Sequence, residues 1–105
     1  MTKADLKKER GYYSTFLYGT ADEKVAALDW LQACRSWGGK RWVQGLLFDD
    51  NAKVRVRAAR FISETDYLPF LKDLEVACKA ERDSQVKKQL QKYLDSLKSL
   101  LPMCK

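Results

Sequence analysis

The feature that most constrains the fold of this chain is a segment that occurs three times in one frame, at residues 20–26, 49–55 and 81–87. Each copy starts with a threonine or an acid and carries a valine at its sixth position. The valines are 29 and then 32 residues apart. A period of this length is typical of stacked helix pairs, in which each unit buries its apolar face against its neighbour.

The composition agrees with one ordered helical domain. Of the 105 residues, 46% are hydrophobic and 32% are charged, while proline and glycine number only two and five. Long stretches rich in Leu, Ala, Lys, Glu and Gln favour helices, and no segment alternates apolar and polar residues long enough to predict a strand. The sequence therefore predicts an all-α fold in a single domain, residues 1–105, with one modest core.

Capping residues and apolar spacing predict six helices. Thr20 and Glu23 have the spacing of a capping box, as do Thr2 and Asp5. Pro69 fits the first turn of a helix, where a missing amide proton costs little. The helices are expected at residues 3–18, between Thr20 and Ser36, between Gly39 and Asp49, after a cap at Asp50 or Asn51, after a cap at Asp66, and between Asp83 and Pro102.

These helices divide into an N-terminal helix at 1–19, a first pair at 20–48, a second pair at 49–81 and a C-terminal helix at 82–105. The C-terminal helix carries an apolar stripe with helical spacing, which is expected to face the core. Its members are Val86, Leu90, Tyr93, Leu94, Leu97 and Leu101.

Residues 46–59 resemble the short HEAT-like repeat of the PBS-lyase type, which has roughly 30 residues. The resemblance extends over residues 20–95 and implies a right-handed α-solenoid of about three helix hairpins. In that family the acid before the valine and the basic residue after it bond across neighbouring repeats. The resemblance thus implies that Asp49 pairs with Arg55 and that Glu81 pairs with Lys87.

The sequence lacks the residues that most enzymes need. It contains no histidine, which removes the commonest general base, the usual catalytic triads and most zinc sites. Gly38-Gly39 is an isolated pair rather than a phosphate-binding loop, and Asp49 and Asp50 are expected to cap a helix rather than hold a metal. We therefore expect a non-enzymatic protein with no catalytic residue, no metal and no cofactor.

The cysteines and the N-terminal residues favour a cytoplasmic protein. Cys34, Cys78 and Cys104 are odd in number and far apart, which is typical of a reducing compartment. Residues 1–10 are strongly charged and lack the apolar run of a signal peptide, and no run of about 18 apolar residues occurs. No membrane partner is expected.

The chain is basic, with 20 Lys and Arg against 14 Asp and Glu and a net charge of +6. Lys53, Arg57 and Arg60 are spaced i, i+4 and i+7, so they are expected to line one exposed face of a helix that can meet phosphates. Acidic neighbours such as Glu64 favour instead an ordinary solvated face. The residues of this nucleic-acid alternative are Lys40, Arg41, Lys53, Arg57, Arg60, Lys88 and Lys92.

Protein binding is the favoured interpretation, because large aromatics gather in the first half of the chain and often anchor interfaces. Trp37, in a glycine-bounded loop, and Tyr12 are the aromatic candidates. In stacked helix pairs the second helices, here the third and the fifth, line the concave side. The candidate contacts on them are Arg41, Gln44, Lys72, Glu75 and Lys79.

The predicted function is that of an adaptor, an assembly factor or a small inhibitor that occludes a surface of its target protein. Given the charge of the chain, the partner is expected to have an acidic surface. The surface would have about the size of a standard interface, roughly 800 Å² per partner. DNA or RNA is the alternative partner, and the apolar run of Leu97, Leu100 and Leu101 also allows a homo-oligomer.

Overall fold

A computed structural model of the chain describes residues 15, 16, 18–34 and 40–101, without the side chains of Cys34 and Lys40. These residues are all helical in architecture and contain no strand, so the all-α prediction is confirmed. The elements are α2 (Ala21–Cys34), α3 (Lys40–Leu46), α4 (Ala52–Glu64), the 3₁₀ turn η2 (Leu68–Phe70), α5 (Leu71–Ala80) and α6 (Ser84–Lys98).

Five α-helices thus lie within the described residues, whereas six were predicted for the whole chain. The difference lies at residues 3–18, most of which are outside the described part. Thr15, Phe16 and Tyr18, at the end of that range, have helical backbone. The capping box expected at Thr2 and Asp5 also lies outside the described residues.

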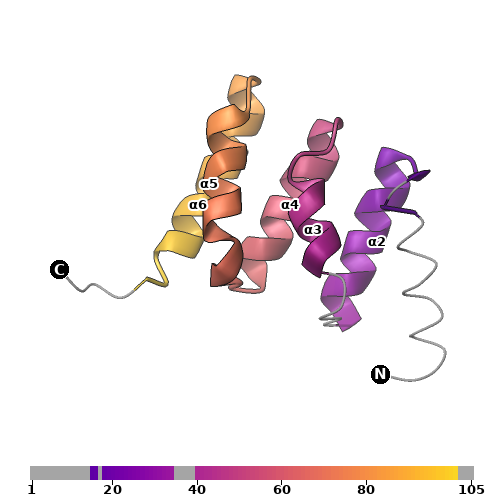
Figure 1. Ribbon diagram of the computed structural model, residues 1–105, viewed down its shortest axis with the longest axis horizontal. Coiled ribbons are helices and arrows are strands. Elements are labelled where there is room, and N and C mark those ends of the chain that lie inside the picture. Colours follow the sequence, from indigo (N-terminus) through magenta and orange to yellow (C-terminus); the bar gives the residue numbers. More distant parts are fainter. Residues whose placement is uncertain (1–14, 17, 35–39, 102–105) are drawn as a thin grey trace.

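The described helices form two layers, with α4 at the centre (Figure 1). In one layer α4 packs between α2 and α6. In the other layer α3 packs on α4 and α5 packs on α6, so that α3 and α5 lie in front of their partners in the view of Figure 1. None of the described helices is long and apolar enough to cross a bilayer.

Three of the predicted helix starts are capped by the expected residues. Thr20 and Glu23 form a reciprocal capping box, in which each backbone N–H donates to the other side chain, at 2.9 and 3.2 Å. The Asn51 side chain accepts from the Lys53 N–H at the start of α4. Asp83 accepts from two backbone N–H groups at the start of α6. These bonds are local, which is why the sequence alone predicts them.

The prediction that Asp66 caps the fifth helix is wrong. Asp66 instead ends α4, with a left-handed backbone (φ 53°). The Tyr67 N–H bonds to the Ile62 carbonyl and the Asp66 N–H bonds to the Ser63 carbonyl, which is the Schellman pattern of helix ends. The chain then makes the 3₁₀ turn η2, with Pro69 in its first positions, before α5 begins at Leu71.

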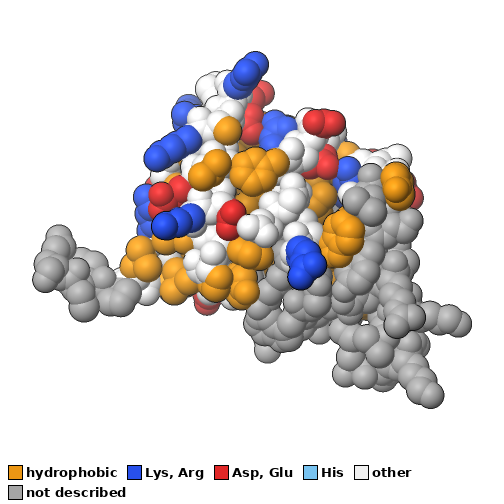
Figure 2. Space-filling model, viewed as in Figure 1, with side chains coloured by type: hydrophobic (Ala, Val, Ile, Leu, Met, Phe, Trp, Pro, Cys, Tyr) orange, Lys and Arg blue, Asp and Glu red, His pale blue; other side chains and the backbone are white. Residues whose placement is uncertain are grey.

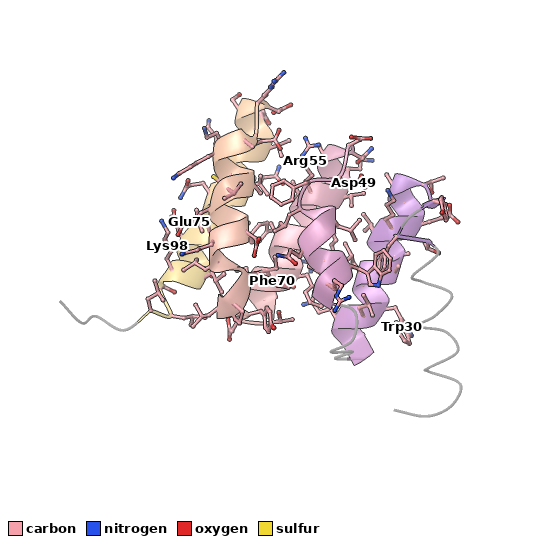
Figure 3. The ribbon with its side chains drawn as sticks, viewed as in Figure 1. Trp30, Asp49, Arg55, Phe70, Glu75 and Lys98 are labelled. Atoms are coloured by element: carbon pink, nitrogen blue, oxygen red, sulfur yellow. The ribbon has the colours of Figure 1, made fainter. Side chains whose placement is uncertain are left out.

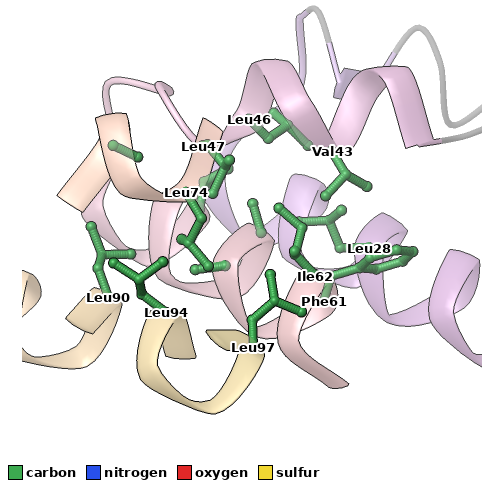
Figure 4. Close-up of a cluster of buried hydrophobic side chains, with 14 of the residues drawn as sticks. Leu28, Val43, Leu46, Leu47, Phe61, Ile62, Leu74, Leu90, Leu94 and Leu97 are labelled. Atoms are coloured by element: carbon green, nitrogen blue, oxygen red, sulfur yellow. The ribbon is translucent and has the colours of Figure 1, made fainter. Parts of the chain in front are cut away.

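The core lies between the two layers and is built from aliphatic side chains of all five helices (Figure 4). Leu28, Leu47, Ile62, Leu74 and Leu90 are among the side chains with no exposed area. Burial of each such side chain stabilises the fold by roughly 1.5–3 kcal/mol.

The apolar stripe of α6 is partly as predicted. Leu90, Leu94 and Leu97 are buried, and Val86 and Tyr93 are half-buried against the core. Leu101 is exposed, because α6 ends at Lys98 and the chain beyond it no longer follows the helical spacing. Leu97 therefore belongs to the core, and only Leu100 and Leu101 remain of the apolar run proposed for self-association.

The repeated segments are joined by ion pairs, but with partners other than those predicted. The Asp49 carboxylate accepts from the Lys24 amine at 2.6 Å rather than from Arg55. Arg55 donates to both oxygens of the Glu81 carboxylate, at 2.8 and 3.1 Å, and its Nη1 donates to the backbone carbonyls of Asp49 and Asp50. Glu81 thus pairs with Arg55 and not with Lys87. Each pair joins one segment to the following one, so these bonds fix the relative position of neighbouring repeats.

Candidate protein-interaction surface

The exposed side of α3 carries the first part of the candidate surface. Arg41 is exposed at the start of this helix and makes no ion pair with another described side chain. Gln44 is half-buried, because its amide donates to the Asp73 carboxylate on α5 at 3.0 Å. Gln44 therefore links the two helices rather than standing free for a partner. Trp37 and Tyr12, the aromatic candidates, lie outside the described residues.

The exposed side of α5 carries the second part. Leu74, Ala77 and Cys78 face the core, so helical geometry puts Lys72 and Lys79 on the opposite side, where both are exposed. Both amines, like the half-buried Glu75, lack an ion pair within the described part of the chain. Glu75 lies on the side of α5 away from α3 (Figure 3).

Two apolar side chains that the sequence analysis missed lie on the same face. Phe48, in the turn after α3, is 49% exposed, and Val76, on α5, is 55% exposed. Figure 2 shows apolar side chains gathered over α3 and α5, with charged side chains around them. We name this surface the α3/α5 face. Its residues are Arg41, Phe48, Lys72, Val76 and Lys79.

The exposure of Val76 could have been predicted from its position along α5. The buried positions of α5 are Leu74, Ala77 and Cys78, and Val76 falls outside this stripe. An apolar residue on the polar side of an amphipathic helix does not serve the core of its own domain. Phe48 gave no comparable signal, since it directly follows the core residues Leu46 and Leu47.

A hollow beside α3 extends the candidate surface. Phe16, Arg41, Trp42 and Gly45 line it together with Leu46 and Asp49, and its volume is about 350 Å³. The rings of Phe16 and Trp42 pack with their centroids 5.9 Å apart. Gly45 leaves the helix surface open here, because a Cβ added to it would have no heavy atom within 4 Å. The surface is therefore uneven, with a hollow next to Arg41, which has no ion pair with a described side chain.

The basic residues of α4 are arranged differently from the prediction of one exposed basic face. Arg57 is only 8% exposed. Its Nε donates to Asp29 at 2.6 Å and its Nη2 donates to Gln32 at 2.7 Å, both on α2. Arg57 therefore holds α2 against α4 and is not available to a phosphate. The expectation failed because position 57 lies at the boundary between the two helices.

Arg60 is exposed but already paired. Its Nε donates to the Glu64 carboxylate at 3.0 Å, and this contact raises the pKa of Arg60 above its ordinary value. The pKa of Glu64 is lowered, first by the hydrogen bond from the Gln32 amide and then by the one from Arg60. Of the three basic residues predicted to share a face, only Lys53 is exposed and has no ion pair with a described side chain.

The remaining basic candidates lie on α6 and at the start of α3. Lys88 and Lys92 are exposed on α6 and form no ion pair among the described residues. Lys40 is the first residue of α3, and its side chain is not described. The structure thus spreads the basic candidates over several helices and does not gather them into one strip.

Within the described ranges, no group of three or more His, Cys, Asp or Glu side chains is placed to hold a metal ion. The Cys78 thiol is buried and donates to the Gln91 side chain at 3.2 Å. The α3/α5 face combines exposed apolar groups with exposed cations, which is the composition of an interface centre and its rim.

No protein-family model, no curated protein and no solved structure matches this chain.

Proposed function

We propose that this chain is a non-enzymatic module that binds another protein through the α3/α5 face. The observation that carries the proposal is the exposure of Phe48, in the turn after α3, and of Val76, on α5 in the same layer. Apolar groups surrounded by charged ones favour a partner that excludes water from the centre and pairs with the charges at the edge. The module would act as an adaptor, an assembly factor or an inhibitor that covers a surface of its target.

The proposed scaffold is a short HEAT-like solenoid. Its support is the three-fold repeat in the sequence, together with the packing of α4 between α2 and α6 and the ion pairs that join successive segments. In such a stack the second helices form the binding side, and here these are α3 and α5.

The proposed partner surface is acidic. Arg41, Lys72 and Lys79 are cations without an ion pair among the described side chains. Of the two acids on α5, Asp73 is bonded to Gln44, and Glu75 lies on the side of α5 away from α3. Unpaired charges at the rim of an interface mainly set association rate and specificity, while the apolar centre sets most of the affinity.

Nucleic-acid binding is the second candidate function. The observation that favours it is the exposure of Lys53, Lys88 and Lys92 without ion pairs to other described side chains. Fewer basic residues are accessible than this function would need, since Arg57 is buried against α2 and Arg60 is bonded to Glu64. Phosphate binding gains its strength from several accessible cations in one strip.

The two candidates are separated by affinity capture from an extract of the source cells, with and without nuclease. The wild type is compared with a Phe48→Ala, Val76→Lys variant and with a Lys88→Ala, Lys92→Ala control. We expect one protein to be captured in stoichiometric amount, to survive nuclease, and to be lost only with the first variant. Capture that nuclease or modest salt abolishes, and that requires Lys88 and Lys92, would establish the nucleic-acid alternative instead.

A further inference from the structure

A groove runs across the other layer of the molecule, over α2, α4 and α6. Val25, Val56 and Val86 contribute one apolar side chain from each helix, and each of them is half-buried. Tyr93 of α6 also lines the groove, whose volume is about 370 Å³. Val56 lies on the side of α4 opposite the core residues Val54 and Ala58, so the groove and the α3/α5 face are on opposite sides of the core.

One wall of the groove is basic. Lys53, Arg57 and Arg60 line it from α4, and Asp22 is the acidic residue among its lining side chains. The Lys53 amine has no hydrogen-bond partner among the described side chains, and Arg60 keeps both Nη groups after its Nε bonds to Glu64. The groove therefore has donors to offer to an anionic group.

Arg57 adds a buried donor that is unsatisfied. Its Nη1 is inaccessible and has no hydrogen-bond partner within the described structure, although its Nε and Nη2 are bonded to α2. A buried donor without an acceptor costs free energy, and such groups are rare in folded proteins. Because Lys53, Arg57 and Arg60 are spaced i, i+4 and i+7, the Arg57 guanidinium adds positive charge between the two accessible cations, although its inaccessible Nη1 does not itself reach a ligand on the surface.

We propose that the groove across α2, α4 and α6 is a second binding site, which takes an extended peptide segment of a partner protein that alternates apolar and acidic side chains. Apolar side chains on one face of the peptide would rest on Val25, Val56 and Val86, because alternate residues of an extended chain point the same way. Its carboxylates would bond to Lys53 and Arg60. The module then carries two binding faces and can bridge two proteins.

The lining favours a peptide over nucleic acid. A phosphate backbone needs a run of accessible cations, whereas here two of the three are already bonded within the chain and Asp22 opposes them. The apolar strip formed by Val25, Val56 and Val86 offers no donor to a phosphate. The apolar floor of the groove and its separated cations instead match a peptide in which apolar and acidic side chains alternate.

The test uses a fluorescein-labelled peptide of about 12 residues that alternates leucine with glutamate, long enough to cross three helices. The comparison probes are the same peptide with lysine in place of glutamate, and oligothymidylate of equal length. Binding is measured by fluorescence anisotropy, and the amide signals of the ¹⁵N-labelled protein are followed during titration. The full chain is used throughout, and each variant is first shown to unfold at the wild-type temperature.

We expect the glutamate peptide to bind with a dissociation constant of about 0.1 mM and to shift the amide signals of Val56 and Val86. Lys53→Glu is expected to weaken it at least about tenfold, and Val56→Lys to weaken it as well. Lys72→Glu changes the net charge equally on the α3/α5 face and is expected to leave binding within about twofold. Because Lys72 belongs to the α3/α5 face, this control also distinguishes binding at the groove from binding at that face.

Three results would overturn the proposal. The first is equal binding of the lysine peptide, and the second is binding that Lys53→Glu and Lys72→Glu weaken equally. The third is binding of oligothymidylate at the groove in preference to the glutamate peptide, which would assign the groove to nucleic acid.

Discussion

The contacts that join α2, α4 and α6 and the α3/α5 face differ in how they use basic residues. Lys24, Arg55 and Arg57 each bond to an acid on another segment, and these contacts join neighbouring helices. On the α3/α5 face, Arg41, Lys72 and Lys79 make no ion pair with a described side chain. Some of the described basic residues therefore join helices while others remain accessible, and the net charge of +6 does not distinguish the two groups.

The largest effect is expected from removal of Arg55. Its four hydrogen bonds join α4 to Glu81 and to the carbonyls of the turn before α4, and the Glu81 side chain is only 5% exposed. Arg55→Ala leaves that carboxylate buried and unpaired, so we expect a loss of about 2–3 kcal/mol in the free energy of unfolding. Urea denaturation followed by circular dichroism measures it.

The matched control is Arg41→Ala on the α3/α5 face, which is expected to change stability by less than about 0.5 kcal/mol. A double variant, Arg55→Ala with Glu81→Ala, is expected to cost less than the sum of the two single changes, because the pair is lost only once. Equal losses for Arg55→Ala and Arg41→Ala would contradict the division of charges described above.

The ion pair between Arg55 and Glu81 also predicts that the protein loses stability in acid. Burial raises the pKa of Glu81, but the hydrogen bonds from Arg55 and from the Asp83 N–H lower it more, so the net pKa is below the ordinary value. The unfolded chain then binds the proton first, and the stabilisation is lost as the pH falls from about 5 through the folded pKa. We expect Glu81→Gln to lose less stability between pH 5 and pH 3 than the wild type, as measured by urea denaturation at each pH.

The Glu81→Gln variant is expected to keep part of the pH dependence of stability, because two other acids have lowered pKa values. Glu64 is held by the Gln32 amide and Arg60, and Glu23 by the backbone N–H and the hydroxyl of Thr20. A wild type and a Glu81→Gln variant with the same acid slope would show that Arg55 does not stabilise the ionised form of Glu81.

The sequence predicted those parts of the fold that depend on bonds within a few residues. The capping box at Thr20 and the caps at Asn51 and Asp83 are of this kind, and the apolar stripe of α6 up to Leu97 follows from helical spacing. Asp66 failed because the same residue type can cap the next helix or, in a left-handed conformation, end the previous one. The repeat frame alone does not decide between these two uses.

The site was harder to predict, because it depends on which charges meet across helices. Asp49 and Arg55 are close in sequence, yet Asp49 bonds to Lys24 and Arg55 bonds to Glu81. One signal was present for Arg57. Asp29 stands where the other two repeats have an apolar core residue, and an acid at such a position indicates a buried basic partner on a neighbouring helix.

Smaller effects on stability are expected at two glycines, Gly45 on α3 and Gly19 before α2. A Cβ at Gly45, on α3, would meet no heavy atom within 4 Å, so Gly45→Ala is expected to raise stability by about 0.5–1 kcal/mol through helix propensity. A Cβ at Gly19, before α2, would lie 2.6 Å from the Thr15 carbonyl oxygen, so Gly19→Ala is expected to lower stability by about 1–2 kcal/mol. Thermal unfolding measures both, and a loss of stability in Gly45→Ala would show that α3 needs the glycine for packing.

The smallest effect on stability is expected at Lys72, a residue whose substitution directly tests the proposed binding face. Its side chain is solvated and makes no ion pair with a described residue, so Lys72→Ala is expected to change the unfolding free energy by less than about 0.5 kcal/mol. If Lys72 belongs to the rim of an interface with an acidic partner, the same change slows association and reduces its dependence on salt, while dissociation stays nearly constant. Surface plasmon resonance with the captured partner at two salt concentrations measures this, beside Phe48→Ala, which is expected to speed dissociation because it removes part of the apolar centre. A Lys72→Ala variant with unchanged association and salt dependence would remove α5 from the binding face and leave only the α3 part of it.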